Sequence, residues 1–149
     1  MSSYPPAVAV AARNAVRQQL QLRSLLDQVE AAFVRSPPRT GVGPDVIAAR
    51  LDSLRGRLQA RFDEEERALL FETIEAHAPE HGTACTRLRQ EHRVLVTRLD
   101  SLRIASPEGR RGSGWVVQVR QFIDDLLEHE DREADLLQRA LDGGTPPGD

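Results

Sequence analysis

The segment FIDDLLEHEDREADLL, residues 122–137, decides the fold of this chain, because its apolar residues recur at alternating spacings of three and four. This period places one apolar stripe along an α-helix. The helical pattern extends from about Trp115 to Leu141. The apolar members of its stripe are Val119, Phe122, Leu126, Leu136 and Ala140. Between Leu126 and Leu136 the same stripe passes through His129 and Glu133, so two polar side chains are expected on the apolar face of this helix.

Three further segments show the same helical period. They run from about Pro6 to Arg35, from about Asp45 to His77, and from about Glu80 to Ala105, and prolines and glycines separate them. The apolar members of their stripes are, in chain order, Ala15, Leu22, Leu26, Val29 and Phe33; Ile47, Leu51, Leu54 and Leu58; and Leu88, Leu95, Leu99 and Leu102. Four amphipathic helices joined by short connections predict an all-α fold, an antiparallel up-down-up-down four-helix bundle.

Length and composition indicate one domain and exclude several classes of function. A chain of 149 residues, 40% of them hydrophobic, fills one core, which we expect over about residues 6–141, with 142–149 as a disordered tail. The net charge of −3 is too small to indicate a nucleic-acid or acidic-membrane partner. A single cysteine, Cys85, excludes an intramolecular disulfide and a cysteine-based zinc site. The N-terminus has the pattern of neither a signal peptide nor a membrane span, so we expect a cytoplasmic protein.

Polar residues fall on the apolar stripes of all four predicted helices, which core packing alone does not require. They are Gln19, Arg61, Glu65, His92, His129 and Glu133. Buried charge is costly unless it is paired or binds a metal ion. All six residues lie near the middle of their helices, so antiparallel packing would bring them to one level. The sequence therefore predicts a polar centre inside the bundle.

The two halves of the chain repeat this arrangement. Each half supplies one inward polar residue from its first helix and two, four residues apart, from its second. Superposition of the leucine stripes aligns three pairs: Gln19 with His92, Arg61 with His129, and Glu65 with Glu133. The second half thus offers two histidines and a glutamate, whereas the first half offers glutamine, arginine and glutamate.

In the order, spacing and inward orientation of these residues, the sequence resembles the hemerythrin-like, or HHE cation-binding, family. The resemblance covers roughly residues 17–141 and rests on the segments EHRVLVTRLDSL, FIDDLLEHEDREADLL and, with one substitution, LQARFDEEERALLFETI. It implies a bundle that holds two irons, each bound by the histidines of one half and bridged by glutamates of the second and fourth helices. The residues that match this ligand set are His92, His129, Glu65 and Glu133, and those that depart from it are Gln19 and Arg61.

Both departures lie in the same half of the chain, so the ligands of one metal position are lost together and those of the other are kept together. Two imidazoles and two carboxylates suit iron(II), and also Mn(II) or Zn(II). Arg61 lies one turn before Glu65 and is expected to point at Glu133 as well, where its permanent charge would replace a cation. The sequence is compatible with one metal ion and with a metal-free polar network, and two ions are not expected.

Three functional hypotheses follow from the resemblance. The leading one is a non-catalytic metal-binding protein, with iron as the expected metal, for O₂, redox or iron sensing, storage or buffering. The second is a metal-free bundle that serves as a partner-binding or scaffold module. The third is a mononuclear metal enzyme in which His92, His129 and a carboxylate form a facial triad. His77 and His81 are also four residues apart, but Pro79 lies between them, and we expect them at a solvated helix end.

Overall fold

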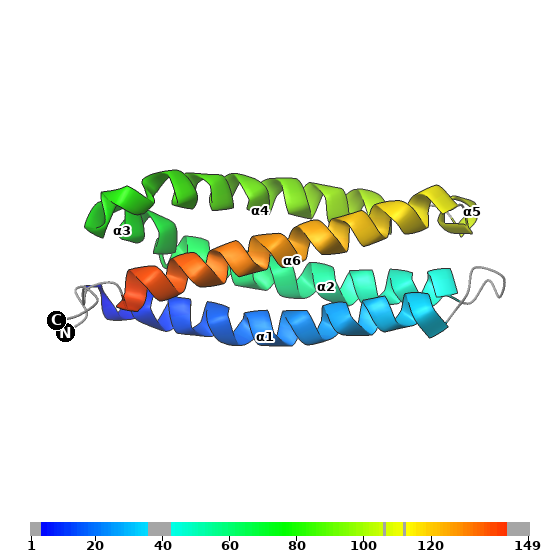
Figure 1. Cartoon of the computed structure of the whole chain (residues 1–149), viewed down its shortest axis with the longest axis horizontal. Helices are drawn as coiled ribbons and strands as arrows, with labels where there is room; N and C mark the ends of the chain where they lie inside the picture. The colour runs from blue at the N-terminus through cyan, green and yellow to red at the C-terminus, as the bar shows by residue number, and fades with distance from the viewer. Residues whose placement is uncertain (1–3, 36–42, 106, 112, 143–149) are drawn as a thin grey trace.

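The computed structural model describes residues 4–35, 43–105, 107–111 and 113–142, and all structural statements concern these ranges. Four long helices lie side by side (Figure 1): α1 (Pro6–Arg35), α2 (Gly43–Arg67), α4 (Gly82–Arg103) and α6 (Ser113–Asp142). Three short helical segments lie between them along the chain: α3 (Leu70–His77), the 3-10 helix η2 (Pro79–His81) and α5 (Pro107–Arg111). The described ranges contain no strand, so the predicted all-α fold class is confirmed.

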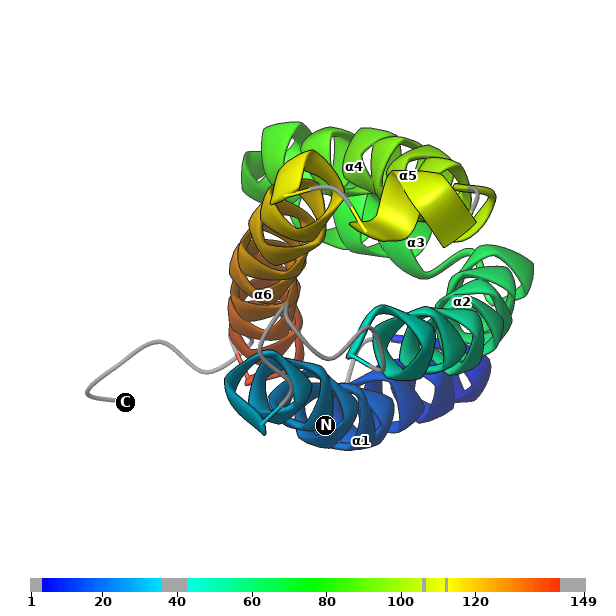
Figure 2. The same cartoon turned by 90° about the vertical axis from the view of Figure 1, so that its right-hand side faces the viewer.

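The long helices enclose a common interior, as the view along the bundle shows (Figure 2). The helix α1 packs against α2 and α6, and α4 packs against the same two helices. Successive long helices run in opposite directions in Figure 1, where the colour follows the chain from blue to red. The core residues predicted from the stripes are all buried: Leu22, Leu26, Leu58, Leu95, Leu99, Phe122 and Leu126. The side chain of Phe33 and residues 143–149 lie outside the described part of the chain. The predicted tail, 142–149, begins one residue too early, because Asp142 is the last residue of α6.

The apolar core is divided into two clusters. The larger cluster includes Leu26, Leu54, Leu99 and Phe122. The smaller cluster lies toward the other end of the bundle and includes Ala12, Ile74, Leu88 and Leu137. On α1, α4 and α6 the predicted inward polar residues fall between the members of these two clusters, and on α2 Arg61 and Glu65 lie beside and after Phe62, the last residue of α2 in the larger cluster. The polar centre is therefore a layer across the bundle with apolar packing on both sides.

The prediction of one continuous helix from about Asp45 to His77 is wrong. The helix α2 ends at Arg67 and α3 begins at Leu70. Between them Leu69 has φ 53° and ψ 42°, a left-handed conformation that costs a residue with a side chain about 1–2 kcal/mol. Leu69 is 57% exposed, whereas Leu70, Phe71 and Ile74 are buried. The break directs the apolar side of α3 against α4, where it packs with Cys85 and Leu88, and this burial offsets the strain.

Two further expectations concern membrane spans and the pair His77 and His81. None of the described helices is long and apolar enough to cross a membrane. His77 ends α3 with an exposed side chain, and its Nδ1 lies 2.9 Å from the carbonyl oxygen of Thr73. His81 belongs to the next element, η2, so the two histidines do not share a helix. This arrangement agrees with the expectation of a solvated helix end.

Candidate metal centre

The structure brings the six predicted polar residues together in one layer of the bundle. Five of them are buried, and His92 is 11% exposed. The ring centroids of His92 and His129 lie 4.9 Å apart. His92, His129 and Glu133 each offer one ligand atom, and these atoms lie within 4.8 Å of one another. Bonds of about 2.0–2.2 Å to a shared ion place two ligand atoms at most about 4.4 Å apart when they lie on opposite sides of it, and closer at any smaller angle, so these atoms would have to move toward one another to share an ion.

His129 is oriented by a carboxylate from the neighbouring helix. Its Nδ1 lies 3.0 Å from Oε1 of Glu91, and Arg132 donates to the other oxygen of Glu91 at 2.6 Å. Burial lowers the pKa of His129 to about 4, so the imidazole is neutral at pH 7. When Nδ1–H donates to Glu91, the lone pair of the neutral ring lies on Nε2. This tautomer leaves Nε2 free to bind a metal ion. This Nε2 is buried and has no hydrogen-bond partner among the described residues.

Glu133 occupies the centre of the layer and is completely buried. Its Oε1 lies 3.2 Å from Nε2 of His92, and its Oε2 accepts a hydrogen bond from Nε2 of Gln19 at 3.0 Å. Burial would raise the pKa of Glu133, but the charge of Arg61 and the hydrogen bond with His92 outweigh it and lower the pKa below its usual range. The imidazole of His92 is held in place by Phe62, whose ring stacks on it with centroids 3.7 Å apart. Glu133 is thus an ionised carboxylate between the two histidines.

Arg61 brings a permanent positive charge into the polar layer. Its guanidinium donates to both oxygens of Glu130 at 2.6 Å and lies 3.1 Å from Oε2 of Glu133. Burial would lower the pKa of Arg61, but the negative charges of Glu133 and Glu130 raise it by more than burial lowers it. The side chain therefore stays charged. The predicted contact of Arg61 with Glu133 is therefore confirmed, and its contact with Glu65 is a longer one, 3.6 Å between Nε and Oε1.

Glu130 is a buried member of the centre that the sequence analysis missed. The predicted apolar stripe of α6 runs from Leu126 through His129 to Glu133 in steps of three and four. A step of four and then three from Leu126 leads through Glu130 to the same Glu133, because the buried face of a bundle helix is wider than a single row. That second route was the signal that would have found Glu130.

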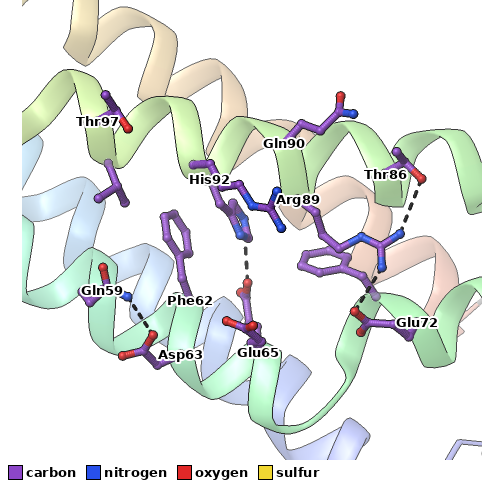
Figure 3. Close-up of a pocket in the computed structure, with 14 residues that line it drawn as sticks. Gln59, Phe62, Asp63, Glu65, Glu72, Thr86, Arg89, Gln90, His92 and Thr97 are labelled. Carbon is purple, nitrogen blue, oxygen red and sulfur yellow. Dashed lines mark hydrogen bonds and ion pairs between the residues drawn. The ribbon is translucent and has the colours of Figure 1, made fainter.

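Glu65 is the one carboxylate of the layer without a close partner. It is 2% exposed, and neither of its oxygens has a hydrogen-bond partner in the described ranges. Its Oε2 lies 3.8 Å from Nε2 of His92, and Figure 3 shows the two side chains pointing toward each other from α2 and α4. Burial and the negative charge of Glu133 raise the pKa of Glu65 well above its usual range. Without a metal ion, Glu65 therefore keeps a proton to a higher pH than an ordinary carboxyl group does.

The donor set and the charges fit one divalent ion. When all carboxylates are ionised, Glu65, Glu130 and Glu133 stand against the single charge of Arg61, which leaves two negative charges in excess in a buried layer. A divalent cation would balance them, and the unpartnered Nε2 of His129 and oxygens of Glu65 would serve as its ligands. On the other side of Glu133 the guanidinium of Arg61 already supplies a positive charge, and the amide of Gln19 donates a hydrogen bond to the same carboxylate.

Fold and site together define a class of protein: a helical bundle with an imidazole and carboxylate centre between its helices. The family model described as the hemerythrin HHE cation binding domain matches residues 11–141. This match spans most of the chain, and the protein belongs to that family, as the sequence motifs predicted. No curated protein and no solved structure matches the chain.

Proposed function

We propose that the four long helices form an antiparallel hemerythrin-like bundle that binds one divalent metal ion, and that this ion is iron, with Mn(II) or Zn(II) as alternatives. The proposed ligands are His92, His129, Glu133 and Glu65. The observation that carries the proposal is the buried Nε2 of His129, which has no hydrogen-bond partner among the described residues and lies close to ligand atoms of His92 and Glu133. A buried nitrogen without a partner is costly, and a metal bond would remove that cost.

Each residue of the layer has a distinct part in this proposal. The two imidazoles are neutral nitrogen donors, and Glu91 orients one of them. Glu133 and Glu65 contribute negative charge to the ion, while Arg61 and Glu130 replace the second ion by an internal ion pair. Bound iron would supply a one-electron redox couple and an open coordination position. A role in O₂, redox or iron sensing or buffering uses those properties, whereas the two-electron chemistry of a two-iron centre needs a second ion.

A metal-free bundle is the second candidate, and one observation favours it. The guanidinium of Arg61 contacts Glu130 and Glu133 within 3.1 Å, so the charges of these two carboxylates are already partly compensated by the protein itself. In that case Glu65 would stay protonated and the layer would be a permanent polar network. The protein would then act as a scaffold or as a partner-binding module.

Metal analysis separates the two candidates. The full chain, purified without an affinity tag, is stripped of metal and titrated anaerobically with Fe(II), and then with Mn(II) and Zn(II). We expect one equivalent to bind, His129→Gln to abolish binding, and the matched control His77→Gln at the bundle end to bind as the unaltered protein does. Stoichiometry near zero for all three metals would reject the metal-binding proposal in favour of the metal-free bundle.

A further inference from the structure

Three pockets reach the polar layer from different sides of the bundle. The α2–α4 pocket, of about 600 Å³, lies between α2, α3 and α4 and reaches Glu65 and His92. The α4–α6 pocket, of about 400 Å³, lies on the other side of α4 and reaches His129. The α1–α2 pocket, of about 130 Å³, reaches Arg61. The first two pockets therefore reach proposed ligands, and the third reaches the guanidinium beside them.

The charges that line the pockets distinguish the routes. The α2–α4 pocket has four carboxylates and two guanidiniums: Asp63, Glu65, Glu66 and Glu72 with Arg89 and Arg93. The α4–α6 pocket has three of each: Glu91, Asp125 and Glu128 with Arg87, Arg98 and Arg132. The α1–α2 pocket is lined by Arg57 and Arg61 and by no carboxylate. A cleft with an excess of one charge raises the local concentration of the opposite ion, and of these three pockets the α2–α4 pocket is the one with more carboxylates than guanidiniums, so it attracts a cation most.

A buried and unpartnered ligand lies at the inner end of the same pocket. Glu65 lines the α2–α4 pocket, is 2% exposed and has no hydrogen bond to its carboxylate within the described ranges. His92 also lines it and is the most exposed of the four proposed ligands, whereas His129 and Glu133 are at most 1% exposed. An ion that comes through this pocket therefore meets Glu65 and His92 before the deeper pair.

The walls of the α2–α4 pocket are held by contacts between α3 and α4. Arg89 of α4 donates to Glu72 and to Glu75 of α3, both at 3.0 Å, which fixes α3 beside the pocket (Figure 3 shows the contact with Glu72). These contacts also compensate the charge of Arg89, so it opposes an incoming cation less. Asp63 and Glu66 flank Glu65 on α2 and supply carboxylates nearer to solvent.

We propose that the α2–α4 pocket is the route by which a divalent cation reaches the centre, with Asp63 and Glu66 attracting it electrostatically and Glu65 as its first inner ligand. This inference rests on the proposed function, because it concerns how the same ion arrives. It adds residues outside the ligand set, and it predicts their effect on the rate of binding and not on the number of ions bound.

Stopped-flow measurement of Co(II) uptake by the metal-free full chain tests the electrostatic part. The variant Asp63→Asn/Glu66→Gln should lower the association rate constant about tenfold at low salt and weaken its dependence on ionic strength. The matched control Asp125→Asn/Glu128→Gln removes the same charge from the α4–α6 pocket and should stay within about twofold of the unaltered rate. Both variants should still bind one equivalent at equilibrium.

A steric pair of variants tests the route independently. Thr97 lines the α2–α4 pocket, and Val94, three residues earlier on α4, lines the α4–α6 pocket. Thr97→Trp should slow both uptake and release of Co(II), whereas Val94→Trp should leave both rates unchanged. Equal Co(II) uptake rates in all variants, or slower uptake in the variants of the α4–α6 pocket, would overturn the proposed route. If these variants still bind one equivalent, the proposed function is unaffected. Absence of Co(II) binding by the unaltered protein at equilibrium would overturn both.

Discussion

Replacement of Arg61 by methionine tests whether its guanidinium is the cation that holds the polar layer together. The side chain is 2% exposed and contacts Glu130 through two hydrogen bonds of 2.6 Å and Glu133 at 3.1 Å. Methionine fills much of the same volume without charge, so its main effect is to leave the buried carboxylates of Glu130 and Glu133 without a counter-charge. Removal of one partner from a buried ion pair destabilises by about 3–5 kcal/mol, and we expect Arg61→Met to fall in that range at pH 7.

The assay is urea denaturation of the metal-free protein, followed by circular dichroism. The control is the double variant Arg61→Met/Glu130→Met, in which both members of the ion pair are apolar and the loss should fall to about 1 kcal/mol or less. Divalent metal should stabilise Arg61→Met more than it stabilises the unaltered protein, because the excess negative charge is larger. A loss below about 1 kcal/mol for Arg61→Met, or an equal loss in the double variant, would show that the guanidinium is not the organising charge.

Three further predictions concern the metal and its protons. The variant Gln19→His/Arg61→His/Glu130→Gln supplies both missing imidazoles and removes the carboxylate that Arg61 neutralises, so iron stoichiometry in an anaerobic titration should rise from one toward two; an unchanged value would contradict the vacated position. Glu91→Gln should weaken Zn(II) affinity by about 10–100-fold, measured by competition with a chelator, while Glu128→Gln should not change it. Because the pKa of Glu65 is raised, the folded protein keeps this proton to a higher pH than the unfolded chain does, so this residue lowers the free energy of unfolding as pH rises above the ordinary carboxyl range. Glu65→Gln should therefore stabilise the metal-free protein at pH 7 and abolish the release of about one proton on Zn(II) binding, measured by calorimetry in buffers of different ionisation enthalpy; proton release equal to that of the unaltered protein would contradict the assignment to Glu65.

The break at Leu69 shows where sequence periodicity was insufficient. The apolar period continues across Ala68, Leu69 and Leu70, and no proline or glycine marks the interruption. The helix ends there because α3 buries Phe71 and Ile74 against α4, and that gain depends on a helix that comes later in the chain. Helix propensity is a local property and does not include such a contact between distant segments. The sequence therefore predicted one helix where there are two.

The amino-acid sequence alone determined the fold class, the inward faces of the helices and the level at which their polar residues meet. Helical period is a local property, and six polar interruptions of four apolar stripes can be counted without coordinates. The partners of those residues were decided by the tertiary structure. Arg61 pairs with Glu130, 69 positions away, and His129 with Glu91, 38 positions away. These contacts depend on how far each helix is rotated and shifted against its neighbours, and side-chain packing between helices sets that geometry.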